Sequence, residues 1–316
     1  MTEEEVVKII GQLKLVKSHV DVIPVKLFKS LAPIIASPLS NIINSSFQNS
    51  IFPDLLKIAR VVPIFKSGDQ SDPTNYRTIS CFPYIGKIFE KCISSRILSF
   101  FCKYQIFSKS QFGFLKGKTT SDALIDLTDF IYNSLDKKEH NVTFLVDLKK
   151  AFDTVNHSIL LRKLEQYGFR GKILNWMASY ISNRRCFVEI GGKKSSEFEL
   201  KVGIQQGSVL GPILFLLYIN DLPLVSQTFK TTLFADDTTF SYSDNSFNYL
   251  ILNSNAELSK IHDWTIRNRL TINVDKTEAI LITNRNYESG EQRLKIGNKH
   301  VEFVESCKFL GIHLDS

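Results

Sequence analysis

Two stretches of the chain are apolar in the way that is typical of β-strands. The segment 141–148, NVTFLVDL, is short and rich in β-branched residues, which predicts a buried strand. The segment 231–240, TTLFADDTTF, has apolar arms on both sides of Asp236 and Asp237. Because neighbouring side chains of a regular strand point to opposite faces, two adjacent carboxylates that act together need a break in the alternation. We therefore expect a tight hairpin with arms at 231–235 and 238–242 and both aspartates at its tip.

Apolar residues recur at helical spacing in several other stretches. Thr2 and Glu5 form a capping-box pattern at the start of the first expected helix. The stretch 120–135 carries an apolar stripe, and Thr120 or Ser121 could cap it. The same spacing predicts further helices at 84–101, 157–169, 171–183, 209–219 and 247–268.

Proline and glycine divide the remaining sequence. Pro33 and Pro38 are expected to interrupt a helical region at 25–47. A Gly-Gly turn at 191–192 predicts a pair of strands within 186–203. Further expected elements are a strand at 57–65, a hairpin at 294–304 and a single strand at 308–314. Strands and helices in this irregular order predict an α+β protein built around an antiparallel sheet.

The composition limits the class of protein. A chain of 316 residues with 43% hydrophobic content can bury a sizeable core. The net charge of +7 is compatible with a polyanionic partner and equally with an ordinary solvated surface. The five cysteines form no CxxC, which argues against a disulfide framework or a zinc site and for a reduced compartment. The acidic start is unlike a secretory signal, and no stretch offers the roughly 18 continuous apolar residues of a membrane helix. We expect an intracellular protein, nuclear or cytoplasmic, that is not secreted and binds no membrane.

Asp147 adds a third carboxylate at the end of the 141–148 segment. If that strand lies beside the expected hairpin, Asp147, Asp236 and Asp237 repel one another and bind protons more readily. Divalent cations relieve this repulsion, because Mg²⁺ prefers hard oxygen ligands and two ions can clamp the attacking and leaving oxygens of a phosphoryl transfer. The aspartates alone leave two alternatives open, an ordinary Asp-rich turn and a metal-dependent hydrolase.

The wider sequence resembles the reverse transcriptases of non-LTR (LINE, jockey-like) retrotransposons. FLVDLKKAFDTVNH, GIQQGSVLGPILFLLYINDL and FADD occur in the order of motifs A, B and C of that family. The resemblance extends over nearly the whole chain through four further segments, ARVVPIFKSGDQSDPTNYRTIS, QFGFLKGKTTSDAL, NRLTINVDKTEAILI and CKFLGIHLD.

The resemblance implies catalytic roles for matching residues. Asp147 and Asp236 would hold two Mg²⁺ ions (Mn²⁺ is an alternative), with Asp237 beside them and the carbonyl of Leu148 as a further ligand. Lys276 would be the general acid for the departing pyrophosphate.

The same resemblance implies substrate contacts. The ring of Phe152 would leave little room for a 2′-OH and so select dNTPs over rNTPs, which argues against an RNA-directed RNA polymerase. Lys66 and Arg77 would grip the triphosphate, and Gln206 with Gly207 would contact the incoming nucleotide. Phe309, Leu310 and Gly311 would position the primer end.

The resemblance also implies a right-hand polymerase fold with helical fingers, a palm with an antiparallel sheet, and a thumb that is absent or truncated. The expected domains are 1–140, fingers with an N-terminal helical extension; 141–300, palm with a partly interleaved fingers insert; and 301–316, the primer-grip strand and the start of the missing thumb. The implied function is RNA-directed DNA polymerisation with an RNA template, a DNA primer and dNTPs. A truncated, catalytically impaired relic that at most binds RNA or an RNA–DNA hybrid is the alternative.

Overall fold

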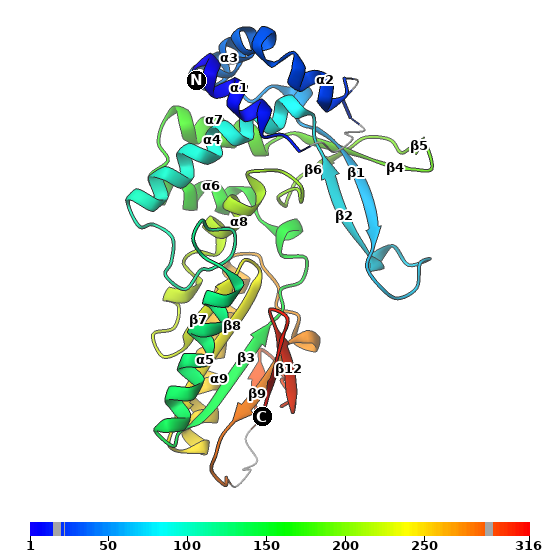
Figure 1. Ribbon diagram of the computed structural model, residues 1–316. Coiled ribbons are helices and arrows are strands. Elements are labelled where there is room, and N and C mark those ends of the chain that lie inside the picture. Colours follow the sequence, from blue (N-terminus) through cyan, green and yellow to red (C-terminus); the bar gives the residue numbers. More distant parts are fainter. Residues whose placement is uncertain (15–19, 22, 288–292) are drawn as a thin grey trace. The chain divides into compact units, whose positions relative to one another are not determined.

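The computed structural model describes residues 1–316 except 15–19, 22 and 288–292 (Figure 1). The chain forms two compact units, each made of two separate segments. The first unit comprises Met1–Ile106 and Val155–Leu217, and the second comprises Phe107–Thr154 and Tyr218–Ser316. The chain therefore leaves the first unit after Ile106, returns to it at Val155 and leaves it again after Leu217.

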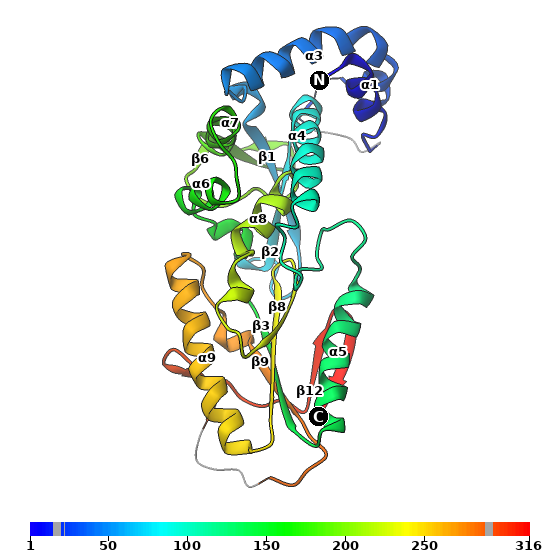
Figure 2. The same cartoon turned by 90° about the vertical axis from the view of Figure 1, so that its left-hand side faces the viewer.

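The second unit is built on a four-stranded antiparallel sheet of order β7-β8-β3-β9. Its strands are β3 (His140–Val146), β7 (Lys230–Phe234), β8 (Asp237–Asp244) and β9 (Glu278–Ile282). Helices α5 (Thr120–Asp136) and α9 (Phe247–Arg267) lie on opposite sides of this sheet (Figure 2). Short elements complete the unit: η3 (Ala151–Thr154), η4 (Leu222–Leu224), η5 (Val274–Lys276), β10 (Lys295–Ile296), β11 (Lys299–His300), β12 (Ser306–Phe309) and β13 (Ile312–Asp315).

The β12–β13 hairpin packs on the side of the sheet that α5 covers. Phe309 of β12 is 3% exposed and shares a core cluster with Leu127 and Ile131 of α5. The single strand expected at 308–314 is therefore wrong. Leu310 and Gly311 both adopt positive φ (46° and 95°), which is the conformation of a two-residue hairpin turn.

The first unit carries a five-stranded sheet of order β2-β1-β4-β5, with β6 also paired to β4. The strands are β1 (Ile58–Phe65), β2 (Tyr76–Cys81), β4 (Arg184–Ile190), β5 (Lys193–Lys194) and β6 (Phe198–Leu200). The helices are α1 (Glu3–Gly11), α2 (Val25–Ser30), α3 (Ala32–Asn49), α4 (Tyr84–Lys103), α6 (His157–Gln166) and α7 (Lys172–Ile181), with η1 (Asp54–Leu56) and η2 (Pro73–Asn75) between strands. β1 and β4 run parallel, so the antiparallel expectation holds for the second unit's sheet but not throughout this one.

The helices follow the expected pattern with two corrections, one at the cap of α5 and one at Pro38. Thr2 accepts a hydrogen bond from the Glu5 amide, which confirms the first cap. The cap of α5 is Thr119, not Thr120 or Ser121, because Thr119 and Asp122 form a reciprocal capping box. Pro38 does not interrupt α3, which continues past it while its buried face packs on α1 and α7.

Helix α8 (Gly211–Ile219) contains the division between the two units. Most of its side chains are buried, as expected for an all-apolar core helix. Among the described residues, no helix is both long and apolar enough to span a membrane.

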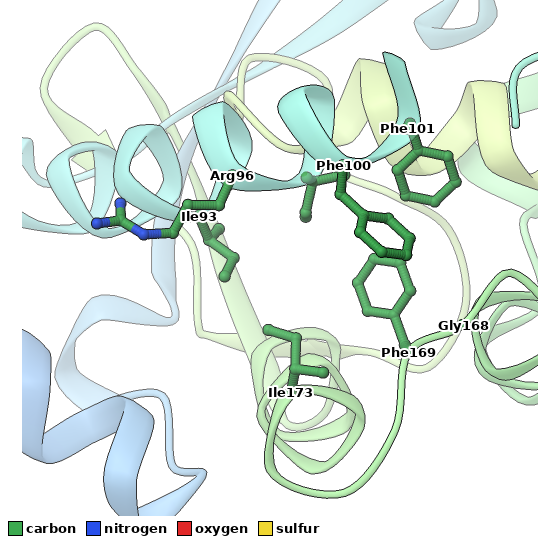
Figure 3. A pocket seen from close by; sticks show the side chains of 8 residues that line it. Ile93, Arg96, Phe100, Phe101, Gly168, Phe169 and Ile173 are labelled. Carbon is green, nitrogen blue, oxygen red and sulfur yellow. The ribbon is translucent and has the colours of Figure 1, made fainter. Parts of the chain in front are cut away.

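An apolar cavity of about 310 Å³ opens in the first unit between α4 and the segment that enters α7. Figure 3 shows Ile93 and Phe100 of α4 facing Phe169 and Ile173 across it. Arg96 also lines the cavity, but its guanidinium binds Glu5 through two contacts of 2.9 and 3.0 Å. The walls that remain are almost wholly hydrocarbon.

Candidate active site

The hairpin that carries the adjacent aspartates is shifted by one residue from the expected one. Phe234 pairs with Asp237, so β8 already begins at Asp237 and the tip consists of Ala235 and Asp236. Ala235 has φ of +57°, a left-handed conformation that a residue with a Cβ rarely adopts. The break in alternation therefore falls before Asp237. Asp236 belongs to the turn, whereas Asp237 is the first residue of β8.

Asp147, directly after β3, lies opposite Asp237, the first residue of the neighbouring strand β8. The β3–β8 register ends with Val146 opposite Thr238, so the next two residues in register are Asp147 and Asp237. Both line a cavity of about 450 Å³. Loss of surrounding water raises the pKa of Asp237 above its ordinary value, and the negative charges of Asp236 and Asp147 raise it further.

Asn273 holds Asp147 in place through two hydrogen bonds. Its side-chain Nδ2 donates to Oδ2 of Asp147 and its backbone N–H donates to the Asp147 carbonyl, both at 2.8 Å. The first bond orients the Asp147 carboxylate and occupies one of its two oxygens, and the second holds the backbone. Asn273 lies within the segment NRLTINVDKTEAILI but was not predicted as a site residue, because its partner is 126 positions away along the chain.

Three other predicted residues line the same cavity. Lys276 ends η5, which begins directly after Asn273, while Phe309 and Leu310 reach the cavity from the β12–β13 hairpin. The remaining charged residues of the lining are Asp275, Glu278 and Lys308. The structure thus brings together Asp147 and Asp237 with one candidate proton donor and one hairpin tip.

Four predicted residues of the second unit are not among the described lining of this cavity. Asp236 is at the hairpin tip, and Gly311 is in the β12–β13 turn. Leu148 is buried, and its backbone forms an isolated antiparallel bridge with Ile272. Phe152 is half-buried in η3.

The first unit contains the other predicted substrate contacts. Arg77 pairs with Ile64 across the β1–β2 ladder, and Lys66 donates its backbone N–H to Asn75 at 2.9 Å. Since side chains two residues apart share a face of a strand, Lys66 and Arg77 project from the same face of this hairpin. Both are exposed.

Gln206 and Gly207 are fixed to the same strand. The Ser80 amide of β2 donates to the Gln206 carbonyl at 2.8 Å. Gly207 has φ of +105°, and a Cβ there would collide with the Ser80 carbonyl oxygen. Glycine is therefore required at this position for two reasons: the positive φ, and the close approach of its Cα to the Ser80 carbonyl.

The sequence matches a known protein family over most of its length. Residues 64–314 match the reverse transcriptase (RNA-dependent DNA polymerase) family. The chain belongs to that family.

Curated relatives agree with the resemblance to jockey-like elements. The chain is 29% identical to a probable RNA-directed DNA polymerase from transposon BS of Drosophila melanogaster and 28% identical to the RNA-directed DNA polymerase from the mobile element jockey of the same species. These alignments cover 99% and 100% of this chain but 35% of each relative, so the chain spans about a third of their length.

Solved structures support the polymerase fold. Telomerase of Candida tropicalis, truncated from its C-terminal domain, matches over 90% of this chain and 59% of its own, with a TM-score of 0.57 and 15% identity. Telomerase of Candida albicans matches with a TM-score of 0.54, 13% identity, and coverage of 90% and 49%. At such low identity the likeness shows the fold alone, and it confirms the predicted polymerase-type α+β class.

Proposed function

We propose that the chain is an RNA-directed DNA polymerase that adds dNTPs to a primer 3′-OH. The observation that carries this proposal is the pair of Asp147 and Asp237, which are adjacent on two strands and line one cavity with Lys276. In the reaction, the primer oxygen bonds to the α-phosphorus, the bond to pyrophosphate breaks, and the 3′-OH loses its proton.

The carboxylates fit divalent metal ions. Asp237 is near two other negative charges that raise its pKa, a repulsion that a cation would relieve. Among the described residues, no three His, Cys, Asp or Glu side chains are grouped closely enough to hold a metal by themselves. Mg²⁺ is commonly held by one or two carboxylates together with substrate phosphates, so this set is sufficient. We assign Asp147 and Asp236 as ligands for Mg²⁺ or Mn²⁺, with Asp237 beside them and the Leu148 carbonyl as a further candidate ligand; bound there, the ions would stabilise charge on the reacting oxygens.

Other residues of the cavity would act on the proton and the primer. Lys276 carries an exposed ammonium group and would protonate the departing pyrophosphate. Phe309, Leu310 and Gly311, at the β12–β13 turn, would position the primer end.

Residues of the first unit would bind the nucleotide. Lys66 and Arg77 project from one face of the β1–β2 hairpin and would neutralise triphosphate charge. Gln206 and Gly207, fixed on β2 through Ser80, would contact the incoming nucleotide. We accordingly assign the first unit to the fingers and the second unit to the palm.

The partners follow from the reaction. An RNA template, a DNA primer and dNTPs would be bound, and the net charge of +7 would favour contact with nucleic-acid phosphates independently of base sequence.

Incorporation of labelled dNTPs on an RNA template annealed to a DNA primer tests the proposal. We expect Mg²⁺-dependent extension that requires the template and is lost in Asp147→Asn. Binding of the hybrid without extension by the wild-type chain would contradict the proposal and favour a catalytically impaired relic.

The sugar preference has its own test. Phe152→Val should increase the use of rNTPs relative to dNTPs by about tenfold or more, since removal of the ring makes room for a 2′-OH. Single-nucleotide incorporation with matched dNTP and rNTP measures the ratio. An unchanged ratio would refute the assignment of Phe152 while leaving the polymerase proposal in place.

A further inference from the structure

A segment with no role in the proposed chemistry lies against the aspartate hairpin. Ser110–Gly113, which overlaps the start of the stretch QFGFLKGKTTSDAL at Gln111, runs beside β7, and its backbone forms hydrogen bonds with Leu233 in both directions. The Leu233 N–H donates to the Ser110 carbonyl and the Phe112 N–H donates to the Leu233 carbonyl, each at 2.8 Å. This segment therefore lines the strand that leads directly to the tip.

The carboxamide of Gln111 bridges the segment and the tip. Gln111 is 1% exposed, and its Oε1 accepts from the backbone N–H of Gly113 at 2.8 Å and of Ala235 at 3.1 Å. Ala235 is itself buried, at 4% exposure. A buried amide that loses its acceptor gains no water in exchange, so this oxygen fixes the position of Ala235.

Ala235 is the residue at which the hairpin most needs such a restraint. Its φ of +57° is unfavourable for a residue with a Cβ. It immediately precedes Asp236 and Asp237, so a change in its backbone would redirect both carboxylates. An external hydrogen bond to the Ala235 amide opposes that change.

Gly113 completes the contact. A Cβ at Gly113 would collide with the Ala235 nitrogen and would lie 2.9 Å from the Phe234 carbonyl carbon. Both atoms are backbone and cannot rotate away, so any larger residue would have to displace the hairpin or the segment.

We infer that Gln111 and Gly113 are positioning residues that set the backbone conformation of Ala235 and thereby the placement of Asp236 and Asp237. The inference rests on the proposed function for its catalytic consequence. Its structural part, the restraint on the tip, can be measured without any activity.

Hydrogen exchange of the full chain without substrate tests the restraint. Gln111→Met keeps the size of the side chain but removes the acceptor, and we expect the Ala235 amide to exchange about 10- to 100-fold faster. Gln166→Met, on an exposed glutamine at the end of α6, is the matched control and should leave this amide unchanged. Wild-type exchange in Gln111→Met would overturn the inference.

A second variant keeps the test decisive if Gln111→Met does not fold. Gly113→Ala should likewise accelerate exchange at the tip, whereas Gly11→Ala, where nothing lies within 4 Å of the added methyl, should not. Wild-type protection in folded Gly113→Ala would again overturn the inference.

Steady-state kinetics test the catalytic consequence. We expect Gln111→Met to lower kcat about 10- to 100-fold with little change in the KM for dNTP, because displacement of reacting groups affects the chemical step more than binding. Adding Ala235→Gly to Gln111→Met should restore part of kcat, since glycine adopts positive φ without the hydrogen bond to Gln111. If the wild-type chain incorporates nothing, the proposed function fails while the exchange result still decides the restraint. Faster exchange with unchanged kcat would overturn the positioning role.

Discussion

Two carboxylate clusters, one in each unit, show how the same functional group can serve opposite purposes. Glu90 of α4 is 1% exposed and has partners for both oxygens. Asp147 and Asp237 lie at a cavity, and the nearest charges that act on Asp237 are negative. Burial raises the pKa of both Glu90 and Asp237; at Glu90 the cation Arg184 opposes the rise, whereas at Asp237 the neighbouring carboxylates add to it.

The Glu90 cluster holds the start of α8. Its carboxylate accepts hydrogen bonds from the Tyr180 hydroxyl at 2.8 Å and from the backbone amides of Val209 and Leu210. Arg184, which donates to Gln205 and to the Tyr180 carbonyl, supplies the compensating charge. A carboxylate that is this deeply buried, with both oxygens bonded to donors of the protein, is out of reach of a ligand, so it stabilises the fold.

The aspartate pair shows the reverse. Asn273 satisfies one oxygen of Asp147, and the charges around Asp237 make it less stable as an anion. Such an arrangement is unfavourable for folding alone and becomes favourable when a cation binds. A carboxylate of a candidate reaction centre therefore differs from a structural carboxylate in that its charge is not fully compensated by partners within the protein.

The largest effect on stability should come from breaking the Glu90 cluster. Glu90→Ala leaves Arg184 without its counter-charge and two amides without an acceptor, which should destabilise the protein by about 3–5 kcal/mol. Urea unfolding measures the loss. Glu165→Ala, at an exposed position of α6, should change little, and an equally small loss in Glu90→Ala would remove the contrast between the clusters.

Asn273 should have an intermediate effect on metal binding. Asn273→Ala frees the Asp147 side chain, and we expect the Mg²⁺ concentration needed for half-maximal incorporation to rise about 10-fold or more. Titration calorimetry with Mn²⁺ gives a readout independent of turnover. Asn133→Ala on the exposed face of α5 is the control; unchanged metal affinity in Asn273→Ala would show that the hydrogen bond is only structural.

The smallest effect should be the pH dependence of stability that Asp237 contributes. Its pKa is raised in the folded state, so the folded protein binds this proton more readily than the unfolded chain does. The resulting stabilisation is fully present below the unfolded pKa of about 4 and is lost as the pH rises through the folded value. In EDTA at pH 8, Asp237→Asn should melt about 1–2 °C above wild type, because the substitution removes the charge that Asp236 and Asp147 repel. The difference is small because solvent screens an exposed charge, and it should disappear near pH 4. A constant gap would contradict the assigned cause.

Strong local patterns made most of the fold predictable. The apolar run at 141–148 and the arms around Asp236 predicted β3, β7 and β8, and helical spacing predicted α5 and α9. The one-residue shift at the hairpin tip escaped prediction, because it depends on Ala235 accepting an unfavourable φ under a restraint from Gln111. The spacing of apolar and polar residues does not indicate a hydrogen bond between segments so far apart along the chain.

The resemblance predicted residues that would act in the reaction, but not the residues that hold them, although Gln111 and Asn273 lie within its motif segments. Asp147, Asp237, Lys276, Phe309 and Leu310 were all named in advance, and the structure places them at one cavity. Asn273 and Gln111 were missed because each acts through a hydrogen bond to a distant segment, at 126 and 124 positions of separation. Polar residues of this kind look like any other loop residue until the fold brings their partners near.

The most direct test of the central claim combines two measurements on Asp237→Asn. We predict that template-directed dNTP incorporation in Mg²⁺ falls at least about 10³-fold, while the melting temperature in EDTA at pH 8 stays equal to or above that of wild type. Asp263→Asn, on an exposed aspartate of α9, should change neither quantity. A variant that keeps its activity, or one that loses activity only because it unfolds, would contradict the claim that Asp237 is a functional rather than a structural carboxylate.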